Sequence, residues 1–159
     1  MMFLTVGTLF SFDRLVQAID QGIADGTIRE EIIAQIGEGG YQPRNMEFVA
    51  FLEKAAFDEK VKQSSGLISH AGMGSIEMSF QYRKPLLVMP RKKKYREHVN
   101  DHQVDTAEKF EQLGHILVAY ESDDLPMKLN ELKSFIPKPR INQISEVVRY
   151  LSEYIQSLK

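Results

Sequence analysis

The feature that most constrains the fold is a regular alternation of short apolar runs with segments of helical periodicity. The apolar runs have the length of strands and lie at residues 2–7, 30–37, 46–52, 66–72, 85–90 and 115–120. The segments with helical spacing lie at residues 12–23, 58–65, 73–83, 101–114, 123–135 and 145–158. Strands that alternate with helices of this length predict an α/β domain with a mostly parallel sheet.

Bulk composition excludes several classes of protein. A chain of 159 residues is long enough for one domain with a sizeable core, and its net charge of −2 gives no electrostatic case for nucleic acid. The absence of cysteine excludes a disulfide scaffold and a thiolate zinc site, and it fits a reducing, cytoplasmic compartment. The first residues lack the pattern of a signal peptide, and no apolar run approaches the roughly 20 residues that span a bilayer.

The segment SHAGMGS, residues 69–75, stands between a predicted strand and a predicted helix. Ligands of parallel sheets bind outside the carboxyl ends of the strands, and Gly72 and Gly74 would let the backbone approach one closely. The free N–H groups at the start of the next helix favour an anion such as a diphosphate. The alternative is a tight turn without a ligand. The segment is not a dinucleotide fingerprint, because Glu77 occupies the third glycine position.

The segment EHVNDHQ, residues 97–103, contains two histidines four residues apart, His98 and His102, beside Glu97 and Asp101. On a helix the two histidines would share a face and could hold a metal ion. The alternative is the capped start of a helix, with Asn100 or Asp101 as the cap and the other polar residues in solvent. Polar recognition of a sugar is a third interpretation, between these two.

Five basic residues lie within residues 91–96, at Arg91, Lys92, Lys93, Lys94 and Arg96. Such a cluster predicts attraction to phosphates or to anionic lipid headgroups, and the alternative is a solvated surface loop.

The last predicted helix, residues 145–158, carries an apolar stripe and follows a proline-bounded connector. It would pack on its own sheet or dock on a partner.

Three motifs in order resemble one enzyme family. LISHAGMGSI, then KPLLVMPR, then EHVNDHQ resemble the nucleotide-sugar-binding half of glycosyltransferase family 28, with a likeness from about residue 2 to residue 125. The chain is similar to the small catalytic subunits of split transferases. One such group serves eukaryotic N-glycan assembly as an N-acetylglucosaminyltransferase, and the other is the PssE-type subunit of bacterial exopolysaccharide synthesis. The resemblance implies a Rossmann-like domain with helices on both faces, half of a GT-B fold.

The resemblance also implies a donor site for a UDP-sugar and an inverting transfer without metal or cofactor. The turn of Gly72 to Ser75 would lie at the diphosphate and uracil, and residues Asp101 to Gln103 would lie at the sugar. The implied donor-binding residues are Gly7, Thr8, His70, Ala71, Gly72, Met73, Gly74, Ser75, Arg91, Asp101, His102 and Gln103. The catalytic residue stays open, with His98, Glu97 and His70 as candidates and the partner as another source of the base.

Two positions depart from the family pattern. Met78 stands where many relatives carry a glutamate that binds the ribose hydroxyls, and Arg83 stands where a glycine usually precedes the KP pair. The neighbouring Glu77 does not replace the missing glutamate, because one residue turns a helical side chain by about 100°. Ribose recognition therefore stays open at the level of the sequence.

The domain prediction is a UDP-sugar-binding GT-B-type half at residues 1–135, followed by a connector and amphipathic helix at residues 136–159. Because a GT-B enzyme needs two halves, the resemblance implies a membrane-anchored, acceptor-binding partner subunit and a lipid-linked acceptor. The chain would then be peripheral at the inner face of the membrane, held there through its partner. Two alternatives are a nucleotide-sugar-binding regulatory subunit without turnover and a structural partner that has lost the site.

Overall fold

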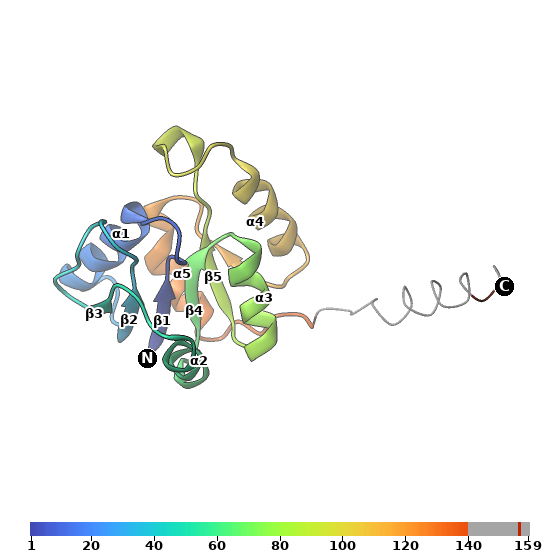
Figure 1. Cartoon of the computed structure of the whole chain (residues 1–159), viewed down its shortest axis with the longest axis horizontal. Coiled ribbons are helices and arrows are strands. Elements are labelled where there is room, and N and C mark those ends of the chain that lie inside the picture. Colours follow the sequence, from blue (N-terminus) through green and yellow to red (C-terminus); the bar gives the residue numbers. More distant parts are fainter. Residues whose placement is uncertain (140–155, 157–159) are drawn as a thin grey trace.

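The computed structural model describes residues 1–139 and residue 156. In this part of the chain six strands form one sheet in the order β3-β2-β1-β4-β5-β6, and every neighbouring pair is parallel (Figure 1). The strands are β1 Met2–Thr5, β2 Ile32–Gln35, β3 Glu47–Val49, β4 Leu67–His70, β5 Leu86–Met89 and β6 Leu117–Val118. The predicted α/β class and parallel sheet are confirmed.

The helices follow the predicted alternation. They are α1 Asp13–Ala24, α2 Lys54–Gln63, α3 Met73–Tyr82, α4 His102–Gln112 and α5 Leu125–Leu132, with 3-10 turns η1 Lys93–Tyr95 and η2 Ser122–Asp124. Helix α2 begins four residues before the predicted start at residue 58. The predicted helix at residues 145–158 lies outside the described residues, apart from residue 156, so its two interpretations stay predictions.

Strands β1, β2, β4, β5 and β6 are mostly buried because the sheet is covered on both faces, as parallel sheets are, whereas the edge strand β3 is exposed. One face packs on α1 and α5 in a cluster that includes Leu4, Leu15 and Leu129. The other face packs on α2, α3 and α4 in a second cluster, centred on residues such as Phe3 and Ile76. Helices therefore lie on both faces of the sheet, as the resemblance implies.

The strand order places the candidate site. The chain winds in one direction from β1 to β2 and β3, and in the other from β4 to β5 and β6, so β1 and β4 are neighbours at the point of reversal. The carboxyl ends of two such strands splay apart and leave a crevice in which ligands bind. The glycine turns after β1 and β4 both reach this point.

Within the described residues, no helix combines the length and the apolar character that are needed to cross a membrane.

Candidate functional site

A cavity of about 290 Å³ lies at the carboxyl ends of β1 and β4. Five predicted donor-binding residues line it, namely Gly7, Thr8, His70, Gly74 and Ser75. These residues come from two turns that are more than 60 positions apart in the sequence, and the parallel pairing of β1 with β4 brings them together. A second cavity, of about 320 Å³, shares Gly7 and Thr8 and extends toward the loops after β2 and β3.

The imidazole of His70 lies between the two glycine turns. A Cβ atom on Gly72 would lie 2.3 Å from Cε1 of His70, and one on Gly7 would lie 3.1 Å from its Nε2. Gly7 also has a φ of +84°, a conformation that favours glycine. The sequence predicted that Gly72 gives room to a ligand. In the structure, the room beside Gly72 is taken by His70.

Hydrogen bonds fix the His70 ring. The backbone N–H of Gly72 donates to Nδ1 at 3.0 Å, which places the ring proton on Nε2, 3.4 Å from the hydroxyl oxygen of Ser75. The Ser75 and Ser69 hydroxyls are 2.8 Å apart, and Ser69 donates to the Thr5 carbonyl at 2.7 Å. Within residues 1–139, the His70 ring has no hydrogen bond to a backbone carbonyl. It joins β4, β1 and the start of α3.

Burial, together with the nearby charge of Arg91 and the electrostatic effect of His98, lowers the pKa of His70 to about 4. The imidazole is therefore neutral near pH 7, and only the unfolded chain takes up a proton at about pH 6.5. Because the folded pKa is depressed, this contribution to stability is present above pH 6.5 and is lost as the pH falls toward 4.

We expect the substitution His70→Gln to flatten the dependence of stability on pH. The glutamine keeps a hydrogen-bonding group but cannot titrate, so between pH 7 and pH 6 the parent should lose about 0.7 kcal/mol more unfolding free energy than the variant. Urea denaturation at both pH values measures the difference. All other residues are the same in the two proteins, so identical pH profiles would show that His70 is not held neutral.

Gly74 differs from the other two glycines, because a Cβ atom there would meet no atom within 4 Å and its φ is not positive. It is the second residue of α3, and Gly72, at the N-cap position, has no side chain to cap the helix. The N–H of Ser75 bonds back to the Gly72 carbonyl, so the first N–H groups of the helix, on Met73 and Gly74, are available to a ligand. This helix start opens into the cavity and favours an anion.

Arg91, a predicted donor-binding residue, holds the β1–α1 loop from inside. Only 4% exposed, it donates through its guanidinium to the carbonyls of Val6 at 3.0 Å, Phe10 at 3.0 Å and Ser11 at 2.7 Å. It also stacks over the ring of Phe12 at 4.6 Å. These contacts occupy the guanidinium and give it a role in shaping the Gly7–Thr8 turn.

Gln103 links the backbone of Arg91 to the ring of His70. Its Oε1 accepts from the backbone N–H of Arg91 at 3.1 Å, and its Nε2 lies 3.5 Å from His70 Nδ1. Of the other predicted donor-binding residues, Ala71 is buried and Met73 is about half exposed. None of Ala71, Met73, Asp101, His102 and Gln103 lines the 290 Å³ cavity.

The two histidines of EHVNDHQ are neighbours, although they do not share a helix. Helix α4 begins at His102, and the rings of His98 and His102 meet edge to face with their centroids 4.5 Å apart. Asp101 occupies the N-cap position without capping, and its carboxylate accepts from the N–H of Lys93 at 2.8 Å. The described part of the chain contains no group of three or more His, Cys, Asp and Glu side chains that could hold a metal ion.

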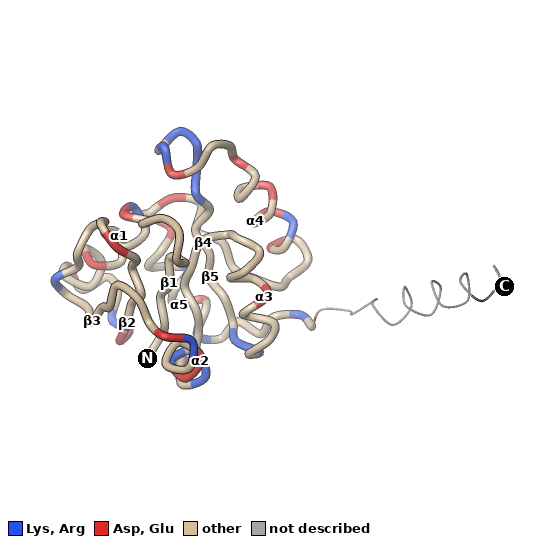
Figure 2. The backbone as a smooth tube through the Cα atoms, viewed as in Figure 1, with Lys and Arg blue, Asp and Glu red and all other residues tan. Residues whose placement is uncertain are grey.

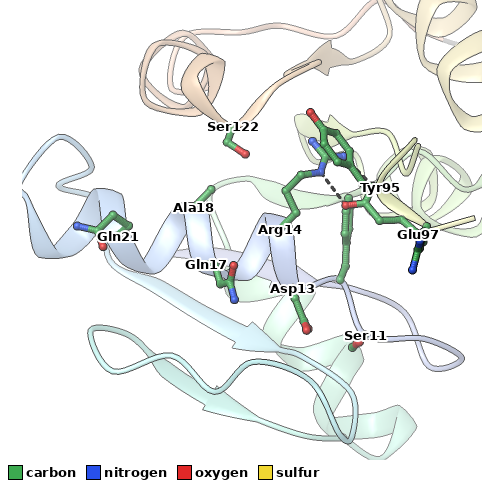
Figure 3. A pocket seen from close by; sticks show the side chains of 11 residues that line it. Ser11, Asp13, Arg14, Gln17, Ala18, Gln21, Tyr95, Glu97 and Ser122 are labelled. Atoms are coloured by element: carbon green, nitrogen blue, oxygen red, sulfur yellow. Dashed lines mark hydrogen bonds and ion pairs between the residues drawn. The ribbon is translucent and has the colours of Figure 1, made fainter. Parts of the chain in front are cut away.

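Glu97, a candidate catalytic residue, is held in an ion pair beside a different cavity of about 570 Å³ (Figure 3). Its carboxylate accepts from Nε of Arg14 at 2.7 Å, from Nη2 of Arg14 at 2.9 Å and from the N–H of Lys92 at 2.9 Å. These bonds stabilise the carboxylate and occupy its oxygens, which does not favour a role as a general base. In His98, by contrast, Nδ1 is buried and has no hydrogen-bond partner within residues 1–139.

The basic run at residues 91–96 divides into three kinds of side chain. Arg91 is buried, whereas Lys92 and Lys94 both pair with Glu121, at 2.7 and 2.9 Å. Hydrogen bonds from these two lysines lower the pKa of Glu121 to about 2. Lys93 and Arg96 are exposed, and neither side chain has an ion pair or hydrogen bond to another residue of segment 1–139.

Several residues that line the 290 Å³ cavity were not predicted from the sequence. They are Thr5, Gln35, Lys54, Phe57, Asp58, Gln81 and Tyr82. Asp58 is the carboxylate in this lining, and its pKa is lowered by hydrogen bonds from Lys54 and Tyr82. Met78 lines the cavity too, at the position where relatives of the resembled family carry glutamate. The four-residue spacing of Lys54 and Asp58 indicates only a helix surface, because the approach of α2 to the cavity depends on the tertiary fold.

Comparisons with known proteins agree with this arrangement. A mouse relative, the UDP-N-acetylglucosamine transferase subunit ALG13, is 31% identical over 123 residues, which make up 72% of this chain and 10% of the relative. The human ALG13 subunit is 30% identical over 124 residues, again 72% of this chain and 10% of the relative. The chain thus spans about a tenth of the length of these curated relatives.

Solved structures share the fold. An NMR structure of ALG13 covers 87% of this chain and 87% of its own length, with a TM-score of 0.57 and 21% identity. The calicheamicin glycosyltransferase CalG4 covers 84% of this chain with a TM-score of 0.61 and 17% identity, and the match takes up 34% of CalG4. The fold is therefore one half of a GT-B arrangement. Residues 1–149 match the glycosyltransferase family 28 C-terminal domain, and the chain belongs to that family.

Proposed function

We propose that this chain is the donor-binding, catalytic subunit of a two-subunit glycosyltransferase that moves a sugar from a UDP-sugar to a lipid-linked acceptor in polysaccharide biosynthesis. One observation carries the proposal: in a member of this family, the Gly7–Thr8 turn and the uncapped start of α3 converge on a cavity at the carboxyl ends of β1 and β4. The relatives are named as UDP-N-acetylglucosamine transferase subunits, which supports a UDP-sugar donor here.

Sugar transfer from a nucleotide donor needs two kinds of assistance. The leaving diphosphate gains negative charge, which N–H groups at the start of a helix stabilise, and the N–H groups of Met73 and Gly74 are placed for this task. The acceptor hydroxyl needs a general base. His98 is the candidate on this chain that the geometry favours, because Glu97 is held by Arg14 and the pKa of His70 is lowered to about 4. The partner is the other source of the base.

The fold supports the need for a partner subunit. The match to CalG4 takes up 34% of that enzyme, so this chain corresponds to about a third of a two-domain transferase. In this proposal a membrane-anchored subunit supplies the acceptor half, and the chain is cytoplasmic and peripheral at the inner membrane face. The proposed reaction is inverting, uses no metal and involves no nucleic acid.

A non-catalytic regulatory subunit that binds nucleotide sugars is the second candidate. The engagement of Glu97 by Arg14 and the presence of Met78 in the cavity favour it, because both reduce the chemical groups that are free to act on a donor. It shares the donor site with the first candidate and differs in lacking turnover.

A binding screen tests the proposal. Calorimetry should show that the purified chain binds UDP and at least one UDP-sugar and that it binds ADP much more weakly. Sugar transfer should appear when membranes that contain the partner are added. UDP-sugar binding without transfer would favour the regulatory candidate, and no binding of any UDP-sugar, with or without those membranes, would contradict both candidates.

A further inference from the structure

Apolar side chains stand in solvent on two loops at the carboxyl edge of the sheet. Leu9 is 84% exposed and Phe10 is 69% exposed, both on the loop after β1, and Val99 is 81% exposed on the loop after β5. Phe10 and Val99 line one open hollow of about 550 Å³ together with Lys93 and Arg96. Glu97 and His98, which are less exposed, also line this hollow, and Leu9 precedes Phe10 on the loop after β1. The exposed residues of the two loop tips therefore form one mixed apolar and basic surface, made of Leu9, Phe10, Lys93, Arg96 and Val99.

The charges of this surface point outward. Lys92 and Lys94 share one carboxylate, that of Glu121, whereas the side chains of Lys93 and Arg96 are exposed and have no partner in the segment 1–139. Figure 2 shows the basic run at the outer end of the loop between β5 and α4, where that loop projects from the body of the protein. Arg96 has a φ of +60°, in the left-handed region that favours glycine. A charged side chain thus stands at a turn position where glycine would fit better.

We propose that this surface binds directly to the headgroup region of an anionic lipid bilayer. Cations attract the phosphates of such a membrane, and apolar side chains at loop tips enter the boundary between headgroups and acyl chains. Lys93 and Arg96 match the phosphates of the headgroups, and the neighbouring Phe10 and Val99 match the apolar boundary below them. Because the whole chain has a net charge of −2, attraction to an anionic membrane has to come from a local face such as this one.

This contact would also orient the protein. The surface belongs to the same edge of the sheet as the turns after β1 and β4, so binding through it would turn that edge toward the membrane. The inference concerns the attachment of this chain itself, without a partner, and it does not depend on whether the 290 Å³ cavity takes a nucleotide.

Sedimentation with vesicles tests the inference on the full chain. The parent should bind vesicles of phosphatidylcholine with about 30% phosphatidylglycerol. It should bind vesicles of pure phosphatidylcholine only weakly. The double variant Lys93→Gln/Arg96→Gln should bind the anionic vesicles about fivefold more weakly at about 50 mM salt, and the difference should shrink at about 300 mM salt because exposed charges are screened. Leu9→Ser/Val99→Ser should weaken binding at both salt concentrations, because apolar contact is not screened.

The matched control is Arg29→Gln/Lys62→Gln, which removes the same charge from exposed residues that precede β2 and β4, at the opposite edge of the sheet. It should bind like the parent, and circular dichroism confirms that each variant is folded. The inference would be overturned if the control variant lost as much vesicle binding as Lys93→Gln/Arg96→Gln, or if the parent did not bind anionic vesicles. Binding only to protease-sensitive native membranes would also overturn it, since a membrane protein would then be the receptor.

Discussion

Replacing Arg91 with methionine should lower the free energy of unfolding by about 3 kcal/mol, because three backbone carbonyls lose charged donors while the methionine fills much of the space. The carbonyls belong to Val6, Phe10 and Ser11, and the guanidinium that serves them is 4% exposed. Removing a buried charge returns part of its desolvation cost, which keeps the expected loss near 3 kcal/mol rather than the full sum of three bonds. Urea denaturation of both proteins measures it.

The same substitution should weaken UDP binding, because the β1–α1 loop carries Gly7 and Thr8 at the cavity. Arg91→Lys should recover little of the stability, since an ammonium group cannot reproduce the planar geometry that reaches three carbonyls. Arg29→Met, at an exposed position, is the control and should change stability by less than about 0.5 kcal/mol. An Arg91→Met variant as stable as that control would show that the guanidinium does not hold the loop.

Much of the fold followed from local pattern. The strands are short apolar runs, and a parallel sheet covered on both faces needs such runs, so β1, β4 and β5 were predicted close to their observed bounds. The start of α2 was placed too late, because Lys54, Ala55 and Ala56 carry no apolar periodicity and Glu53 gives no side-chain cap. Helix formation there depends on the packing of Phe57 and Val61 on the sheet.

The candidate site was predictable only in part. The glycine turns and His70 were found because they lie at strand ends, and these positions follow from the sequence. The roles of Gly72 and Arg91 could not be predicted from the sequence. Gly72 makes room for the His70 ring, and the Arg91 guanidinium donates to backbone carbonyls 80 or more positions away. The pairing of Glu97 with Arg14 also joins segments that are far apart in the chain. Such contacts depend on tertiary geometry, which periodicity and spacing do not encode.

Gly74→Val is expected to lower UDP affinity at least tenfold, which corresponds to about 1.4 kcal/mol. In the structure a Cβ atom at this position enters open space beside the cavity and the backbone has no positive φ, so the substitution should not disturb the fold. A branched side chain there would occupy the space in front of the free N–H groups at the start of α3. Gly74→Ala, with a single methyl group, should have a smaller effect on affinity in the same direction.

Calorimetric titration of UDP into the parent and the folded Gly74→Val variant is the measurement that tests the donor site most directly. Circular dichroism confirms the fold of each protein, and Lys128→Gln, a change on α5 away from the cavity, serves as the control. We expect the parent and the control to bind UDP equally and Gly74→Val to bind at least tenfold more weakly. A folded Gly74→Val variant that binds UDP as tightly as the parent would contradict the assignment of the diphosphate to the start of α3.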